Sequence, residues 1–221
     1  MPTIAIVGAG PGLGLSIAEV FGGHGYDVAL ISRDAGRLGG LVDRLAADGI
    51  AAAAFPADAA DHDQLTAALG DAAARFGGVD VLEYSPHAGL VQVAPQEVTV
   101  ENLQPQLDQL LHGAVAATRA VLPAMLAAGA GSLLFTTGGG AVDPYPRLAT
   151  VNIAQAGLRN WVLNLHRTLA GQGVYAGLVA IDVFIGASAP EGVPHLPPGE
   201  IAPVYWDLHT RRDRAEHHVG V

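Results

Sequence analysis

The chain of 221 residues contains no cysteine and no lysine, and few of its residues are aromatic or charged. Without cysteine, neither a disulfide framework nor a thiolate site can form. Aromatic residues make up 5% of the chain and charged residues 14%, whereas half of it is hydrophobic. The core is therefore expected to consist of Ala, Val, Leu and Gly, which suit close packing of helices on a sheet. All 11 basic residues are arginine, so no lysine ammonium is available to any site.

The sequence also lacks the marks of a nucleic-acid surface and of a membrane span. Its net charge is −10, whereas neutralising phosphates requires clustered Lys and Arg. Every long apolar run is interrupted by Gly, Pro or a charged residue before it reaches membrane-spanning length. The first residues run directly into a strand pattern, without a basic and apolar leader. We therefore expect a cytoplasmic protein with no nucleic-acid or membrane partner.

Short apolar runs alternate with longer helix-like stretches, a pattern typical of βαβ units and a parallel sheet. No composition break divides the chain, so residues 1–221 are predicted to form one Rossmann-type, doubly wound α/β domain with helices on both faces of the sheet. The expected strands are 3–8, 27–32, 50–57, 79–85, 131–137 and 175–183. The expected helices are 13–23, 35–47, 62–75, 100–128, 152–171 and a final one over 201–218. A Pro- and Gly-rich segment, 186–203, is predicted to be a flexible loop on the substrate side.

The stretch IAIVGAGPGLGLSIAEVF near the start predicts a strand, a glycine turn and a helix. Residue 13 is Leu, so the glycines fit G-x-x-x-G-x-G rather than G-x-G-x-x-G. Such a turn directs backbone N–H groups and the positive end of a helix dipole toward a pyrophosphate. The alternative is a glycine-rich turn without a ligand, but its place after the first strand favours a dinucleotide site. The candidate binding residues are Gly8, Gly10, Gly12, Leu13 and Gly14.

The second strand ends in LISRD, which bears on the choice of dinucleotide. An acidic residue directly after this strand would bond the ribose hydroxyls and repel a 2′-phosphate. Ser32 and Arg33 offer instead a hydroxyl and a guanidinium, which suit a phosphate. The sequence thus favours NADP(H) over NAD(H). Asp34 leaves NAD(H) open, and the alternative for Arg33 is a solvated surface residue.

The glycine turn, the helix end AATRAVLPAML, the strand GSLLFTT and the helix AQAGLRNWVLNLHRTLA together resemble the short-chain dehydrogenase/reductase family. The likeness covers nearly the whole chain. In that family an acidic residue after the third strand bonds the adenine amine, and FPADAAD supplies Asp58 at the matching place, with Ala59 beside it. The family's Asn-Asn-Ala-Gly turn after the fourth strand reads EYSPH here. Ser85 and Pro86 are therefore expected to contact the cofactor.

The resemblance also implies an assembly. In the family the counterparts of helices 100–128 and 152–171 pack between subunits. Here these helices are apolar over more than one face, as the run AVAATRAVLPAMLAA illustrates. Because a helix that is apolar over so much of its surface needs cover on both sides, we expect a homodimer or homotetramer.

The family's chemistry depends on four residues that this chain replaces. They are a Tyr acid, a Lys four places later that lowers the pKa of the Tyr toward neutrality, a Ser and an Asn. The aligned positions hold Val151 for Tyr, Gln155 for Lys, Gly138 for Ser and Leu110 for Asn. No Tyr-x-x-x-Lys occurs anywhere in the sequence. The family's closing strand and glycine-rich end are also expected to be missing.

Two tyrosines are candidates to replace the missing acid, and the sequence does not decide between them. Tyr145 lies in the loop after the fifth strand, where Arg147 could act on it as a Lys would. The alternative is a loop Tyr packed between two prolines. Tyr84 is expected to wall the cofactor pocket together with Ser85 rather than to donate protons. The catalytic residues therefore stay unknown.

The nine histidines show no ligand spacing, so no metal site is expected. His87 is expected to be a solvated loop residue, and His217 and His218 an exposed end of the chain. No Ser-His-Asp triad can be assembled from the motifs.

The leading interpretation is an NADP(H)-binding protein similar to the short-chain dehydrogenases, an oxidoreductase of non-standard or weak chemistry acting on an unknown small molecule. The alternative is a catalytically silent nucleotide-binding sensor or partner subunit, and a third possibility retains only the scaffold. The glycine turn, Arg33 and Asp58 favour the first two. The replaced tetrad favours the second over the first, whereas the family resemblance favours an enzyme.

Overall fold

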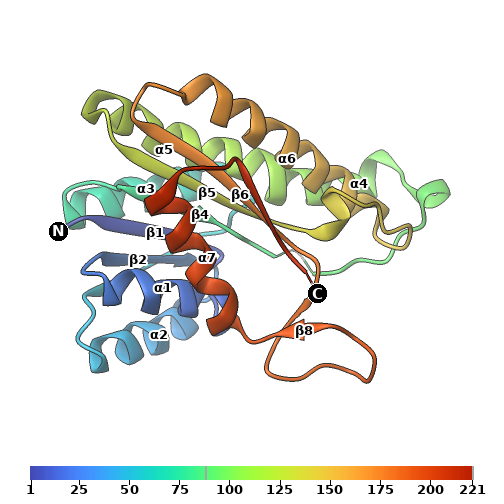
Figure 1. Cartoon of the computed structure of the whole chain (residues 1–221), viewed down its shortest axis with the longest axis horizontal. Helices are drawn as coiled ribbons and strands as arrows, with labels where there is room; N and C mark the ends of the chain where they lie inside the picture. Colours follow the sequence, from blue (N-terminus) through green and yellow to red (C-terminus); the bar gives the residue numbers. More distant parts are fainter. Residues whose placement is uncertain (88, 221) are drawn as a thin grey trace.

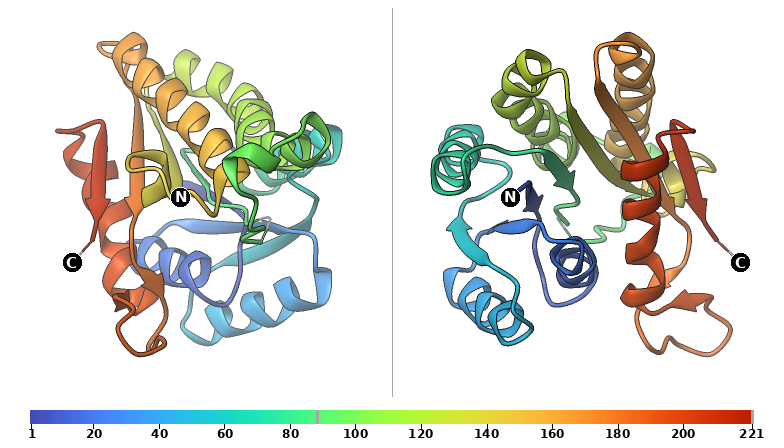
Figure 2. Two further views of the ribbon diagram at one scale, coloured as in Figure 1. Left: turned by 90° about the vertical axis from the view of Figure 1, so that its right-hand side faces the viewer. Right: turned by 60° about the vertical axis from the view of Figure 1, so that its left-hand side comes forward.

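A seven-stranded parallel sheet forms the centre of the protein, with strand order β3-β2-β1-β4-β5-β6-β9 (Figure 1). The computed structural model describes residues 1–87 and 89–220; Ala88 and Val221 lie outside the described residues. Helices α3, α5 and α6 cover one face of the sheet, and α1, α2 and α7 cover the other (Figure 2). The predicted doubly wound α/β fold is confirmed.

The observed elements follow the predicted order closely in the first two thirds of the chain. The strands of the large sheet are β1 (Thr3–Val7), β2 (Asp27–Ser32), β3 (Ala52–Pro56), β4 (Val81–Tyr84), β5 (Gly131–Gly138), β6 (Val174–Ile181) and β9 (Glu216–Val219). The helices are α1 (Leu13–Gly23), α2 (Ala35–Ala47), α3 (His62–Phe76), α4 (Val100–Gln106), α5 (Gly113–Ala128), α6 (Ala149–Leu169) and α7 (Pro198–Arg211). A separate two-stranded sheet consists of β7 (Phe184–Ile185) and β8 (His195–Leu196).

The strand order explains where a ligand can bind. Strands β1 and β6 are buried along their whole length, as expected for parallel strands with helices on both sides. The chain runs outward from β1 to β3 and then returns to β4 on the other side of β1. In open α/β sheets ligands bind beyond the carboxyl ends of the strands at this reversal.

The long predicted helix 100–128 is interrupted. A π-helical segment, Leu107–His112, separates α4 from α5 and begins two residues after Pro105 of α4. Proline removes a backbone donor and crowds the preceding turn, which is a common cause of such an irregularity. By length and composition alone, Val100–Ala128 would pass as a membrane span. The core helix of a soluble protein passes the same test, and α5 packs on the sheet and on α3.

The prediction that the closing strand is missing is wrong. Residues Glu216–Val219 form β9, which pairs in parallel with β6 at the edge of the sheet. The sequence EHHV is short and polar, so it shows none of the apolar pattern from which a strand is predicted. It can still form an edge strand, because such a strand needs little apolar surface. Its place is fixed by side chains, since Arg159 of α6 bonds both carboxylate oxygens of Glu216 at 2.6 and 2.7 Å. Accordingly, His217 is a half-buried strand residue rather than an exposed end, whereas His218 is exposed.

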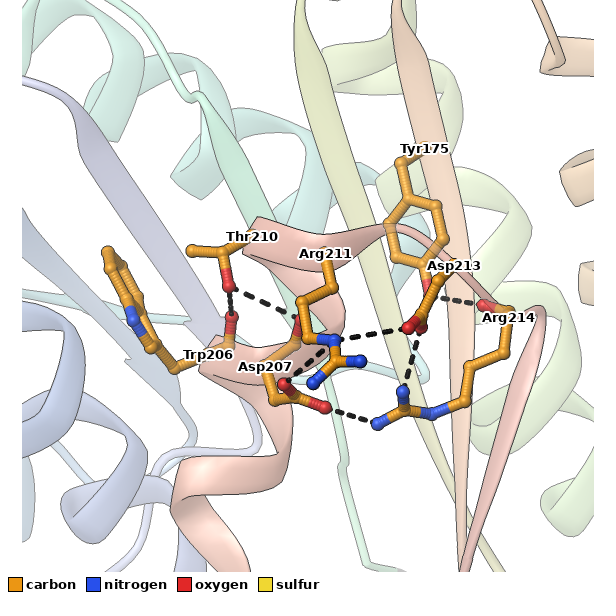
Figure 3. A network of polar contacts seen from close by, with 7 residues as sticks. All are labelled: Tyr175, Trp206, Asp207, Thr210, Arg211, Asp213 and Arg214. Carbon is orange, nitrogen blue, oxygen red and sulfur yellow. Dashed lines mark hydrogen bonds and ion pairs between the residues drawn. The ribbon is translucent and has the colours of Figure 1, made fainter.

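The final helix is also shorter than predicted, ending at Arg211 instead of continuing to residue 218. Arg212 follows in the left-handed conformation, with φ of 52°. A group of ion pairs then holds the turn that leads to β9 (Figure 3). Arg214 pairs with both Asp207 of the helix and Asp213 of the turn, and its backbone carbonyl accepts a hydrogen bond from the Tyr175 hydroxyl.

The predicted loop 186–203 extends only to residue 197, because α7 begins at Pro198. Proline is well suited to the first turn of a helix, where its missing N–H leaves no bond unmade. The remaining segment carries β8, which pairs with β7 just before the segment; β8 lies at the lower right of Figure 1.

Candidate cofactor site

A cavity of about 490 Å³ lies at the carboxyl ends of β1, β2, β3 and β4. Seven of the residues predicted to bind a cofactor line it, and they come from four different loops. They are Gly8, Gly10, Ser32, Arg33, Asp58, Ala59 and Pro86. The described fold thus brings most of the predicted residues together, although their role in binding stays a prediction.

The glycines of the first turn divide into two kinds. Gly8 has a φ of +97°, and a Cβ there would lie 2.6 Å from the Pro86 nitrogen. A Cβ on Gly14 would lie 3.0 Å from the Ala9 Cα, so this glycine lets the helix approach the turn. By contrast, a Cβ on Gly10 or Gly12 would meet nothing closer than 4.0 Å. Gly8 and Gly14 are therefore required by the fold, whereas Gly10 and Gly12 leave room for a ligand.

The other four predicted residues do not line the cavity. Leu13 and Gly14 begin helix α1, and Leu13 packs against the apolar cluster beneath this helix. Ser85 is half-buried, and its hydroxyl donates to Glu83 Oε2 at 2.9 Å instead of facing the cavity. Gly12 also lies outside the cavity lining, at the N-terminal end of α1, where helix N–H groups and the positive dipole end are available to an anion.

The end of β2 and the first turn of α2 each supply one guanidinium group to the cavity. Arg33 is exposed and lines it together with Ser32. Asp34 follows Arg33 and caps helix α2 by accepting a hydrogen bond from the Arg37 backbone N–H at 2.9 Å, while its Oδ2 lies 3.9 Å from the Arg37 guanidinium. Arg37 itself also lines the cavity. Sequence reasoning missed Arg37, although its place three residues after a helix-capping Asp was a usable signal.

The far wall of the cavity is formed by the loop after β3 and by one residue of the π-helical segment. The carboxylate of Asp58 accepts a hydrogen bond from the Ala60 backbone N–H at 3.0 Å, which fixes its orientation beside Ala59. Gln109 also lines the cavity and is nearly buried. No sequence motif pointed to Gln109, because its approach depends on the path of the interrupted helix.

The prediction that Tyr84 walls the pocket is wrong. Its side chain is buried in the core, and its hydroxyl donates to the Gln109 carbonyl. A Cβ on Gly113 would lie 2.2 Å from this hydroxyl, so the glycine makes the space that the phenol fills. Burial raises the pKa of Tyr84 far above its usual value. Tyr84 is therefore not available as a proton donor.

The four positions aligned with the family's catalytic residues form two pairs of neighbours. Leu110 and Val151 are buried in one apolar cluster with Ala154. Gln155 Oε1 accepts a hydrogen bond from the Gly138 backbone N–H at 3.0 Å. A Cβ on Gly138 would lie 3.2 Å from the same oxygen, so the amide fills the space that a side chain at 138 would enter. This end of the site is therefore built from aliphatic groups and one amide.

The remaining candidate acid, Tyr145, lies in the loop between β5 and α6. It is 59% exposed, so it is not packed between its neighbouring prolines. Asn152 donates to its backbone carbonyl at 2.7 Å, which holds the main chain rather than the phenol. His87 is an exposed loop residue at the rim of the cavity, as predicted, and its Nδ1 accepts from the Gly89 N–H at 3.0 Å. Within residues 1–87 and 89–220 no group of three or more potential metal ligands is present.

Comparison with known proteins identifies the family. Residues 2–185 match the family model described as short chain dehydrogenase. The chain belongs to the short-chain dehydrogenase family. It is 32% identical over 176 residues to a 2,3-dihydroxy-2,3-dihydro-p-cumate dehydrogenase of Pseudomonas putida, covering 79% of this chain and 68% of that one. It is 26% identical over 220 residues to a fatty acyl-CoA reductase of Mycobacterium tuberculosis, covering 96% and 74%.

Solved structures of short-chain dehydrogenases have the same architecture. A short-chain dehydrogenase from Rhodopseudomonas palustris superimposes with a TM-score of 0.87 at 25% identity, over 100% of this chain and 98% of that one. A metagenomic short-chain oxidoreductase in complex with NADP gives 0.85 at 23% identity, over 100% and 98%. A 3-oxoacyl-[acyl-carrier protein] reductase from Brucella melitensis with bound NAD gives 0.84 at 20% identity, over 100% and 89%. The family's oxidoreductase fold and its NAD(P)-binding architecture are thus shared by this chain.

Proposed function

We propose that this protein binds NADP(H) in the cavity at the carboxyl ends of β1 to β4. The observation that carries this proposal is the pair of guanidinium groups that line the cavity, Arg33 directly after β2 and Arg37 in the first turn of α2. A guanidinium suits a 2′-phosphate, and the nearby Asp34 is engaged in capping a helix. Gly10 and Gly12 leave open space at the turn, which suits the approach of a pyrophosphate.

The chemistry that we propose is that of an oxidoreductase with a weak or non-standard proton transfer. A bound nicotinamide would supply or accept the hydride. The residues aligned with the family's acid and its helper are Val151 and Gln155, and neither can release a proton near neutral pH. A positioned proton donor contributes roughly 10²- to 10⁴-fold in rate, so its loss leaves slow turnover.

A catalytically silent nucleotide-binding sensor or partner subunit is the second candidate. The apolar contact of Leu110 with Val151 favours it, because this cluster offers neither a proton donor nor a polar group to hold a water. The two candidates share the same cofactor site and differ only in turnover. A substrate is not assigned, and a cytoplasmic location stays a prediction.

The test is a titration of the purified protein with NADPH and with NADH. We expect NADPH to bind at least ~10-fold more tightly, which corresponds to about 1.4 kcal/mol. Arg33→Ala should remove most of this preference, whereas Arg167→Ala, an equal loss of charge on α6, should leave it unchanged. Equal affinity of the unmutated protein for both cofactors would falsify the assignment.

Turnover separates the two candidates. The unmutated protein is incubated with NADPH and a panel of reactive carbonyl compounds, and NADPH consumption is followed. Slow consumption that depends on the carbonyl supports the weak oxidoreductase. Tight NADPH binding without any consumption supports the sensor or partner subunit.

A further inference from the structure

A buried carboxyl group that the family chemistry does not use lies in the centre of the sheet. Glu83, on β4, has no exposed surface. Ser85 donates to its Oε2 at 2.9 Å, and Thr136 of β5 donates to its Oε1 at 3.0 Å. The Thr136 hydroxyl also bonds the hydroxyl of Tyr205, which belongs to α7 and is itself fully buried. Four side chains from three elements and the loop after β4 thus form one hydrogen-bonded chain.

The surroundings of Glu83 favour its neutral form. Burial raises its pKa to about 8, and the hydrogen bonds from Ser85 and Thr136 lower it by less. The ionisable group that faces it is the phenol of Tyr205, whose own pKa is raised by burial and by Glu83. Within the described residues, both hydrogen-bond partners of the Glu83 carboxyl group are uncharged hydroxyls. A hydroxyl can act as donor or acceptor, so the network accommodates the acid proton on either oxygen.

The two ends of this network reach functional parts of the molecule. At one end, the Ser85 N–H donates to the Val7 carbonyl at 2.9 Å, and a Cβ on Gly8 would lie 2.7 Å from the Ser85 carbonyl carbon. Ser85 therefore packs against the cofactor turn. At the other end, Tyr205 anchors α7, the helix that follows the substrate-side loop and lies across the sheet beside α1 (Figure 1).

We propose that Glu83, as the neutral acid, is a positioning residue that couples the cofactor turn to α7 and to the preceding loop 186–197. It does not contact the cofactor; it acts through Ser85 and Tyr205. When Glu83 ionises, the buried charge has no cation beside it, and the network must open to admit water. The turn at Gly8 and the anchor of α7 would then loosen together. This inference deepens the proposed function and relies on NADP(H) as the cofactor.

The test compares the unmutated protein with Glu83→Gln between pH 6.5 and pH 9.5. Gln keeps the shape and hydrogen bonds of the neutral acid but cannot ionise, and every other titratable group is the same in both proteins. We expect the NADPH dissociation constant of the unmutated protein to rise about fivefold over this range relative to that of Glu83→Gln. Amide hydrogen exchange of residues 186–211 is measured without cofactor. In the unmutated protein the exchange rate should rise with pH more steeply than the intrinsic chemical exchange rate does. In Glu83→Gln it should rise only as steeply as the intrinsic rate.

Tyr205→Phe provides a second, independent variant if Glu83→Gln does not fold. It removes the bond to Thr136, keeps the ring, and should increase exchange in α7 already at pH 6.5. In the unmutated protein, amide exchange accelerates as the pH rises. In Tyr205→Phe this acceleration should occur at a lower pH or be absent. An unchanged exchange profile in Tyr205→Phe would contradict the coupling.

The outcomes separate the two proposals. If the unmutated protein and Glu83→Gln bind NADPH with the same pH dependence, the role of Glu83 is refuted while NADP(H) binding stands. If neither protein binds NADPH but their exchange profiles diverge with pH, the cofactor assignment fails while the structural coupling stands. If the unmutated protein and Glu83→Gln differ neither in the pH dependence of NADPH binding nor in that of hydrogen exchange, the proposal is refuted and Glu83 is only a buried acid of the core.

Discussion

The two ends of the site differ in what they offer to a dinucleotide. The end beside β2 and β3 presents two guanidinium groups, a fixed carboxylate and an open glycine turn. The end beside β5 and α6 presents the buried pair Leu110 and Val151 and the Gln155 amide on Gly138. The first end has groups that suit a charged ligand, whereas the described residues of the second end are aliphatic groups, a glycine and an amide at the positions aligned with the family's catalytic residues.

We infer from this difference that cofactor binding and proton transfer can be separated within one fold. The binding groups sit in loops after β1, β2 and β3, and none of them depends on the identity of residues in α6. At the second end the aliphatic side chains of Leu110 and Val151 add to the core, because burying an aliphatic side chain stabilises a protein by about 1.5–3 kcal/mol. The proposed function therefore combines a cofactor pocket with a position aligned with the family's acid that contributes packing instead.

The largest expected effect comes from restoring the chemistry at the second end. The triple variant Gly138→Ser, Val151→Tyr, Gln155→Lys should gain at least about 100-fold in NADPH-dependent reduction of reactive carbonyls, measured as NADPH consumption. All three changes are needed together, because a Cβ at 138 lies 3.2 Å from the Gln155 amide oxygen. The larger Tyr is expected to cost about 1–3 kcal/mol beside Leu110, measured by denaturant unfolding.

The matched control for this gain carries Phe in place of Tyr at position 151, with the other two changes kept. It has the same volume but no phenol, so it should show no gain. If the unmutated protein turns over briskly and the triple variant is slower, the chemistry lies elsewhere, and Tyr145→Phe becomes the next variant to measure.

A smaller effect is expected from the glycine turn at the first end. Gly10→Ala should weaken NADPH binding at least about 10-fold and leave the unfolding midpoint unchanged, because Gly10 lines the cavity and its new methyl group would enter open space that the cofactor is proposed to use. Gly8→Ala should destabilise the protein itself, since it combines a φ of +97° with a 2.6 Å approach to Pro86. Equal losses of stability in the two variants would contradict this division of roles.

The last prediction concerns assembly through helices α5 and α6, which cover the sheet at the second end of the site. It would give twice or four times the mass of one chain and has the smallest expected effect on the site. We propose that α5 and α6 pack against a second copy of the chain, because Leu126 and Ile153 are exposed apolar side chains on these helices. Light scattering at micromolar concentration should give a dimer or tetramer. A mass of 22.5 kDa would overturn this expectation.

Much of the fold could be predicted from the sequence, because the alternation of short apolar runs with helix-like stretches and the glycine turns are strong local signals. The fully buried parallel strands were harder to orient. Glu83 and Tyr84 point to opposite faces of β4, and a strand covered on both faces carries no alternation that shows which side each residue takes. For this reason Tyr84 was predicted at the pocket, and the network around Glu83 was missed.

Two further features depended on contacts that are distant in sequence. Strand β9 exists because β6 offers a free edge and Arg159 binds Glu216, and neither fact can be seen in the letters EHHV. The contact of Gln155 with Gly138 likewise joins residues on different elements. Their alignment with family positions predicted that they would be neighbours, but not that the amide would fill the space left by the glycine.

The contrast between the two ends can be measured directly with a cofactor fragment. The protein is titrated by calorimetry with NADPH and with 2′-phosphoadenosine-5′-diphosphoribose, which lacks the nicotinamide. If the first end carries the binding, the fragment should bind within about fivefold of NADPH, a difference below roughly 1 kcal/mol. A fragment that binds more than about 100-fold more weakly than NADPH, or no binding of either, would contradict the claim that the binding end is kept while the reactive end is altered.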